Sequence, residues 1–163
     1  MNRGRPRTRR RAVGVEIRPF RPGDGSCLAA LVRRCLREVN GRDYPVDAID
    51  RMSAHFTPER FVELSRIRRV YVADGGRPVG TVSRDGNRVY TLFVDPDFAG
   101  QGIGRRLLRH IEDLAAREGH AYMETGASIT AHSFYLRLGY GDVHEDDAEP
   151  VLRKPLPPPP DPA

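Results

Sequence analysis

A glycine-rich turn between a strand and a helix is the part of this chain best suited to bind a ligand. Residues 92–108 read LFVDPDFAGQGIGRRLL, so an apolar run precedes three alternate glycines and an amphipathic segment. Such a turn presents unpaired backbone N–H groups at the start of a helix, where the helix dipole is positive. Gly100, Gly102 and Gly104 let the backbone approach a ligand closely. The turn therefore predicts a site for a phosphate-bearing cofactor.

Two common phosphate-binding motifs do not fit this turn. The dinucleotide fingerprint requires a third glycine where Arg105 stands, and an acidic residue at the end of a second strand about twenty residues later. The P-loop requires a lysine and a hydroxyl residue, and the turn has neither. The remaining alternative to a cofactor site is an ordinary glycine-rich turn that binds nothing.

Coenzyme A fits the same residues better. Its diphosphate can accept hydrogen bonds from the N–H groups of residues 101–105, and its two amides can pair with the backbone of strand 92–94. Backbone donors neutralise the phosphates, so we expect no metal. The expected cofactor-binding residues are Leu92, Phe93, Val94, Gly100, Gln101, Gly102, Ile103, Gly104 and Arg105.

The elements around the turn predict one α/β (α+β) domain, with a mixed central sheet of about six or seven strands flanked by about four helices. Apolar alternation and turn residues predict strands at 13–19, 70–73, 78–83, 88–94, 121–127, 140–143 and 150–153. Helical periodicity predicts helices at 27–39 (capped by Asp24 or Ser26), within 44–65, at 103–117 and at 130–138. In helix 103–117, we expect Glu112 to face water with the arginines.

Length and charge divide the 163 residues into three parts: a basic arm at 1–12, a domain at 13–156 and a proline-rich tail at 157–163. Six of the 27 basic residues lie in the first eleven positions, which leaves 21 basic against 22 acidic residues elsewhere. No aromatic residue is interleaved with these arginines, so a solvated extension is favoured over a nucleic-acid-binding tail.

Membrane attachment and secretion are not expected either. No apolar run is long enough to span a membrane, and no apolar segment of a secretory signal follows the basic arm. Cys27 and Cys35 are eight residues apart in an expected helix, which is about 12 Å and too far for a disulfide. Two unpaired cysteines indicate a cytoplasmic protein.

Four segments resemble the GCN5-related N-acetyltransferase (GNAT) superfamily over most of residues 15–156. They are 15–19 (VEIRP), 79–82 (VGTV), the strand and glycine turn at 92–104, and a later motif with Ala127, Ser128, Ala131, Phe134-Tyr135 and Leu138-Gly139-Tyr140. Two departures occur. Ala99 stands where the family usually has Arg or Gln, and Ser128 stands where an Asn is often found.

The resemblance implies an acetyl-CoA-dependent transfer to a primary amine. It implies that Tyr135 points at the coenzyme sulfur as the general acid, and that a backbone N–H of strand 92–94, that of Val94, stabilises the oxyanion. The general base is poorly marked. Tyr90 and Glu124 are candidates from the strands on which related enzymes place a base, and His132 is a weaker one, expected to be exposed.

The acceptor pocket is expected from residues 27–65 and 139–150, where Glu145, Asp146, Asp147 and Glu149 could attract a cationic amine. The amine itself is not identified by the sequence, and both a monomer and a homodimer remain open. Two other functions stay as alternatives. One is a non-catalytic acyl-CoA-binding module, and the other is a nucleic-acid-associated protein that uses the arginine arm.

Overall fold

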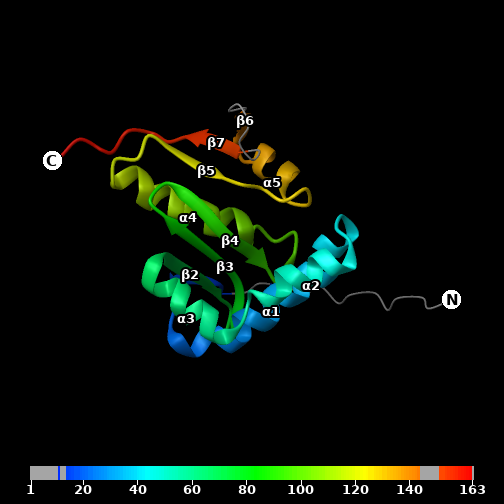
Figure 1. The fold of residues 1–163 in the computed structure, drawn as a ribbon. Helices are drawn as coiled ribbons and strands as arrows, with labels where there is room; N and C mark the ends of the chain where they lie inside the picture. The colour runs from blue at the N-terminus through cyan, green and yellow to red at the C-terminus, as the bar shows by residue number, and fades with distance from the viewer. Residues whose placement is uncertain (1–10, 12–13, 144–150, 163) are drawn as a thin grey trace.

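The computed structural model describes residues 11, 14–143 and 151–162. It contains one seven-stranded sheet with the order β1-β2-β3-β4-β5-β7-β6 (Figure 1). Neighbouring strands are antiparallel, except for β4 and β5, which are parallel. The strands are β1 (Glu16–Pro19), β2 (Arg69–Asp74), β3 (Pro78–Asp85), β4 (Arg88–Val94), β5 (Tyr122–Thr125), β6 (Gly141–Val143) and β7 (Val151–Pro155).

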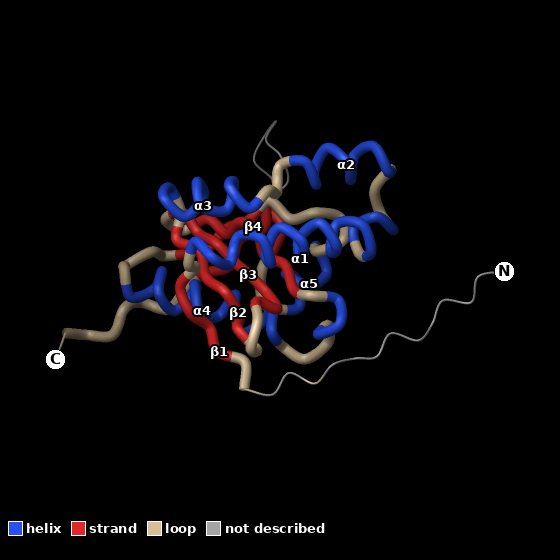
Figure 2. Tube along the Cα trace, turned by 90° about the horizontal axis from the view of Figure 1, so that it is seen from below, coloured by secondary structure: helices blue, strands red, loops and turns tan. Residues whose placement is uncertain are grey.

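Five α-helices cover the two faces of the sheet. They are α1 (Gly25–Glu38), α2 (Val46–Ala54), α3 (Pro58–Ile67), α4 (Ile103–Arg117) and α5 (His132–Arg137). Figure 2 shows α1 and α3 on one face and α4 on the other. The core is divided accordingly, because buried residues of α1–α3 pack around Val72, whereas those of α4 and α5 pack around its neighbour Ala73. The predicted fold class is confirmed.

Strand β3 is the centre of the fold. It is buried from Pro78 to Arg84, because helices cover both of its faces. Gly80 is required where α4 crosses the strand, since an added Cβ would lie 3.0 Å from a methyl carbon of Leu107. No helix in the described ranges has the length and apolar character that a membrane span needs.

Strand β4 is paired very differently on its two sides. It pairs with β3 along most of its length, with a register shift between Thr81 and Ser83, and Thr91 in the shifted segment has a φ of +51°. With β5, the register contains only the pair Arg88–Glu124. The two parallel strands therefore separate after Arg88 of β4 and Glu124 of β5, and the second half of β4 has no strand neighbour on that side.

Two local predictions are wrong because the side chains concerned bind partners outside their own helix. Helix α1 begins at Gly25 without a side-chain cap, because the Asp24 carboxylate instead accepts two hydrogen bonds from Arg18, both at 2.8 Å. Glu112 does not face water. It is buried and accepts hydrogen bonds from Tyr140 Oη and Lys154 Nζ, each at 3.1 Å.

Parts of the expected organisation lie outside the described residues. These are nearly all of the basic arm and the acidic cluster 145–149. Residues 157–162 of the expected tail form neither helix nor strand. The three-part division of the chain therefore stays a prediction.

Candidate functional site

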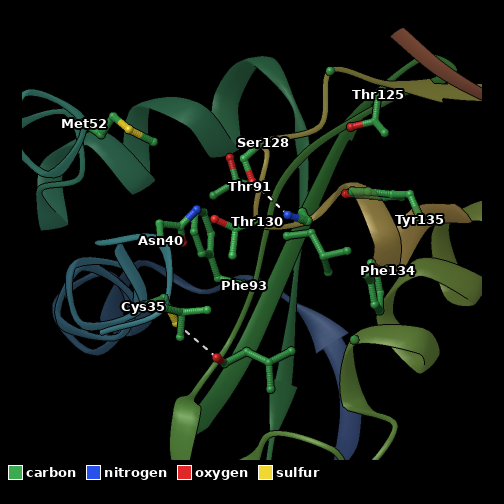
Figure 3. Close-up of a pocket in the computed structure, with 16 residues that line it drawn as sticks. Cys35, Asn40, Met52, Thr91, Phe93, Thr125, Ser128, Thr130, Phe134 and Tyr135 are labelled. Carbon is green, nitrogen blue, oxygen red and sulfur yellow. Dashed lines mark hydrogen bonds between the residues drawn. The ribbon is translucent and has the colours of Figure 1, made fainter. Parts of the chain in front are cut away.

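A cavity of about 320 Å³ occupies the gap where β4 and β5 separate. Its floor is the second half of β4, and its two walls come from segments that are far apart in the sequence (Figure 3). One wall is the end of α1 with α2, and the other is the loop after β5 with α5. A gap between parallel strands is a common place for a ligand in α/β proteins, because it offers backbone groups that no strand has used.

The backbone of β4 supplies unpaired groups to this cavity. The Asp95 N–H donates to the Val79 carbonyl at 2.8 Å, which fixes residues 93 and 95 as the ones bonded to β3. By alternation, the N–H groups of Leu92 and Val94 point the other way, into the gap. The Val94 carbonyl also accepts a hydrogen bond from the Cys35 thiol at 3.0 Å, on the wall formed by α1.

The glycine turn lies at the end of the same strand. Gly100 and Gly102 have φ angles of +74° and +79°, and Gly102 immediately precedes α4. Both positions favour glycine because other residues are strained there. The first N–H inside the helix ladder is that of Arg106, which donates to the Gly102 carbonyl at 3.0 Å. The N–H groups of residues 103–105 therefore have no partner within α4 and can bind an anion.

Gly104 has a different role, which is close packing. A Cβ at this position would lie 3.3 Å from the ring of Phe134 and 3.5 Å from Val94. The first turn of α4 thus contacts both α5 and the floor of the cavity. This contact brings the anion-binding turn and the cavity together as one site.

An ion-pair network around the buried Asp95 carboxylate holds the segment between β4 and the turn. The Asp95 carboxylate is paired with Arg34 at 3.1 Å and with Arg77 at 3.0 Å, and Arg34 also binds Asp97 at 2.8 Å. These hydrogen bonds join α1 and β3 to the short 3-10 turn Pro96–Phe98. The network fixes where the chain leaves β4, and therefore where α4 begins.

Tyr135 lies in the wall formed by α5, and its ring lines the cavity (Figure 3). The side chain is 5% exposed, and burial raises the pKa of Tyr135 to about 12, although a hydrogen bond with Thr125 acts in the opposite direction. Its ring packs between those of Phe134 and Tyr140, with 5.3 Å between centroids in each case. The hydroxyl is therefore protonated at neutral pH and held in one place.

The structure does not bring Tyr90 and Glu124 to this cavity. The Tyr90 ring is covered by Arg68, whose guanidinium carbon lies 3.6 Å from the ring centroid. Glu124 pairs with Arg153 at 3.0 Å. Strand alternation explains why the Glu124 side chain points away from the cavity, because its neighbour Thr125 lines it. The bulge explains why Tyr90 lies outside the cavity. Thr91 lines the cavity instead and breaks the alternation from which Tyr90 was proposed as a general base.

His132 is also outside the cavity lining. Its Nε2 lies 2.8 Å from a carboxylate oxygen of Asp142 on β6, and the side chain is 43% exposed. None of the three sequence-based candidates for a general base therefore lines the cavity.

A second cavity of about 350 Å³ adjoins the glycine turn and is strongly basic. Arg105 and Arg109 of α4, Arg137 of α5 and Lys154 of β7 line it, with Glu112 as the acidic member. Lys154 is paired with Glu112, whereas the three arginines form no ion pair with an acidic side chain that the structure describes. Unpaired guanidinium groups favour an anionic ligand. Only Arg105 of this group was expected from the sequence.

The acceptor side of the main cavity was located by the sequence only as a range. Residues 27–65 contribute Cys35, Val39, Asn40 and Met52, while residues 139–143 contribute nothing to the lining and the rest of the expected 139–150 segment lies outside the described residues. Two hydrogen bonds bridge the walls at this side. Ile129 N–H donates to Tyr44 Oη at 2.8 Å, and Thr130 donates to Asp43 at 2.6 Å. No local pattern marks these residues.

Comparison with known proteins identifies the class to which this fold and cavity belong. Residues 44–150 match the family model described as the acetyltransferase (GNAT) domain. The chain therefore belongs to the GNAT acetyltransferase family, and it is an acetyltransferase, as the sequence motifs predicted.

Individual relatives are similar over most of their length. The chain is 29% identical to "Uncharacterized N-acetyltransferase YafP" of Escherichia coli over 136 residues, which is 83% of this chain and 87% of that protein. It is 29% identical to "Peptidyl-lysine N-acetyltransferase YjaB" of Salmonella typhimurium over 147 residues, covering 88% and 94%. The solved structure of the PaiA N-acetyltransferase from Thermoplasma acidophilum, in complex with coenzyme A, has the same fold, with a TM-score of 0.76 at 17% identity, covering 88% and 99%.

Proposed function

We propose that this protein transfers the acetyl group of acetyl-CoA to a primary amine by direct attack of the amine on the thioester. The observation that carries the proposal is the gap between β4 and β5, which combines unused β4 backbone groups, the glycine turn and the buried Tyr135 hydroxyl in one site. PaiA, which has this fold, was solved in complex with coenzyme A, and this supports acetyl-CoA as the co-substrate.

The residues present fit the parts of acetyl-CoA. The diphosphate would bind the N–H groups of residues 103–105, next to the open space at Gly102. The two pantetheine amides would pair with the Leu92 backbone and the Val94 carbonyl, as an added strand would, which leaves the Val94 N–H free for the acetyl oxygen. The basic cavity lined by Arg109 and Arg137 would bind the phosphate on the ribose of the coenzyme.

Tyr135 would act as the general acid, and its raised pKa indicates how the proton reaches the sulfur. A phenol with a pKa of about 12 is a weaker acid than a thiol of about 8.5, so complete proton transfer to the sulfur alone is unfavourable. Tyr135 must therefore take up the proton that the nitrogen loses in the same step. The C–N bond forms, the C–S bond breaks, and the proton passes from nitrogen to sulfur through the hydroxyl.

The Val94 N–H would stabilise the negative charge that develops on the acetyl oxygen. It belongs to a backbone held in place by the Asp95 network, so it needs no reorganisation during the reaction. Tyr90 and Glu124 take no part in this proposal, because neither lines the cavity.

A panel of primary amines with acetyl-CoA tests the proposal, with release of the thiol as the signal and reactions without amine as the control for hydrolysis. We expect at least one amine to accelerate thiol release, and the acetylated product to appear by mass spectrometry. Binding of acetyl-CoA without acceleration by any amine would instead support the non-catalytic binding module.

A further inference from the structure

Asn40 is a buried carboxamide with free hydrogen-bonding groups in the wall of the main cavity. The residue is 8% exposed and lies directly after α1. Its backbone carbonyl accepts the N–H groups of Asp43 at 2.9 Å and Tyr44 at 3.1 Å, which fixes the turn. Its side chain forms no hydrogen bond with any residue that the structure describes, and Figure 3 shows it directed into the cavity. Its amide atoms are not among the fully enclosed polar atoms without a partner, so they open onto the cavity and are available to a ligand there.

The surroundings of Asn40 are polar but uncharged. The Thr91 side chain, which the strained backbone of the bulge places in the cavity, likewise has no hydrogen-bond partner among the described residues. The Ser128 hydroxyl accepts the Ala131 N–H at 3.2 Å and keeps its own proton for another acceptor. Met52 supplies apolar surface, and none of the 16 described lining residues carries a charge.

Asp43, the acidic residue that contacts this lining through Thr130, does not itself line the cavity. Its carboxylate accepts the hydrogen bond from Thr130, and the residue is exposed. A charged group that entered the cavity would therefore lose its water and meet only neutral partners in the described lining, which is far more costly than burying a hydrogen-bonded neutral group.

We propose that Asn40 determines acceptor specificity, by exchanging hydrogen bonds with a neutral polar group, an amide or a hydroxyl, that the acceptor carries near its amine. This inference rests on the proposed function. A carboxamide both donates and accepts, so it matches an amide or a hydroxyl and does not favour a carboxylate. The same lining excludes acceptors with a carboxylate near the amine.

Three amines of nearly equal shape test this assignment: β-alaninamide, 3-methylbutylamine and β-alanine. They carry, at the same position, a neutral amide, an apolar group and a carboxylate. We expect the wild-type protein to give the highest kcat/KM with β-alaninamide and the lowest with β-alanine. The same comparison is made for the best acceptor of the amine panel and its analogue without the neutral polar group.

The Asn40→Leu variant should lose the preference for the amide. We expect the ratio of kcat/KM for β-alaninamide to that for 3-methylbutylamine to fall by about tenfold or more, because an acceptor amide would be left unpaired. The KM for acetyl-CoA should not change. Asn87→Leu, the same substitution in the turn between β3 and β4, should leave the ratio at the wild-type value.

Two results would overturn the assignment. One is an unchanged ratio in Asn40→Leu, including the case in which kcat/KM falls equally with all acceptors, and the other is a wild-type preference for β-alanine. They differ from failure of the proposed function, in which the wild-type protein binds acetyl-CoA and acetylates no amine at all. That result would remove this inference together with its basis.

Discussion

The two sides of strand β4 contrast sharply. Toward β3, the strand is paired from Arg88 to Val94 with a neighbour that is buried under helices on both faces. Toward β5, the register contains a single pair, and beyond it the strand borders a cavity. The bulge at Thr91 lies beyond that pair, in the part of β4 that borders the cavity. The comparison shows how a central strand can be both part of the core and a ligand-binding edge.

The proposed coenzyme side and acceptor side of the site differ in a related way. The proposed coenzyme side, formed by the floor of the cavity and the glycine turn, consists mainly of backbone groups and glycines, which a side-chain substitution can block but not remove. The acceptor side consists of side chains such as Asn40 and Met52, whose chemistry can be exchanged without altering the backbone. We therefore expect the largest effects from residues that close the coenzyme side, and smaller effects elsewhere.

Blocking the glycine turn should have the largest effect. Gly104→Asp would place a Cβ 3.3 Å from the ring of Phe134 and a carboxylate near the proposed diphosphate site. We expect the affinity for acetyl-CoA to fall by roughly 100-fold or more, because like charges would be held together. Isothermal titration calorimetry measures this directly.

Two further variants serve as controls for the Gly104→Asp result. Gly104→Ala separates crowding from charge and should lose less affinity. Gly23→Asp makes the same substitution where nothing lies within 4 Å of the new Cβ, and should bind as the wild type does. Wild-type affinity in Gly104→Asp would show that the turn does not hold the coenzyme.

Removing the Tyr135 hydroxyl should affect catalysis more than binding. For Tyr135→Phe, we expect kcat to fall by about 100-fold, a typical contribution of general acid–base catalysis, with little change in the KM for acetyl-CoA. The control is Tyr140→Phe, in the neighbouring ring of the same cluster, whose hydroxyl binds Glu112 instead of lining the cavity. If both variants lost kcat equally, Tyr135 would have no special role.

Alkaline pH should destabilise the protein through Cys35. Burial raises the pKa of this thiol from 9.0 to about 12. Between these values the unfolded state releases the proton and the folded state keeps it, so stability is lost as the pH rises above 9. At pH 10, Cys35 should account for about 1.4 kcal/mol of this loss, or about tenfold in the unfolding constant.

Urea unfolding at pH 7 and pH 10 checks this value. Cys35→Ala should show a smaller loss of stability between the two pH values than the wild type. Cys27→Ala, a half-buried cysteine of the same helix, controls for removal of a thiol. An identical pH dependence in Cys35→Ala and the wild type would contradict the assigned burial of the thiol.

Weakening the basic cavity should have the smallest effect. Arg137→Gln should lower the affinity for coenzyme A by about fivefold at low salt and by less at high salt, because one partly screened charge is lost. The affinity for dephospho-coenzyme A, which lacks the ribose phosphate, should not change. Arg117→Gln at the exposed end of α4 is the matched control. An equal loss for both ligands would place the ribose phosphate elsewhere.

The sequence predicted the strand, the turn and the helix that form the proposed coenzyme side, because their signal is local. Strand β4, the glycine turn and α4 follow one another within 30 residues, and the family motif specifies them. The position of Glu112 could not be predicted, since its partners lie 28 and 42 residues away and a helical pattern does not contain them. Tyr90 does not line the cavity, because a bulge that the sequence does not reveal interrupts the alternation of the strand.

Asn40 illustrates the limit for the acceptor side. Nothing near it in the sequence distinguishes it from an ordinary residue after a helix. Its role depends on β4 and β5 separating more than 50 residues later, and on the loop around Ser128 closing the opposite wall. Such a site is defined by tertiary structure alone.

Residue-resolved amide hydrogen exchange with and without acetyl-CoA tests the central claim most directly, namely that the unpaired side of β4 and the first turn of α4 hold the coenzyme. The ligand should slow exchange at the amides of Leu92, Val94 and residues 103–105, while Phe93, already bonded to β3, should change little. Unaltered exchange at Leu92, Val94 and the turn in the ligand-saturated protein would contradict the account.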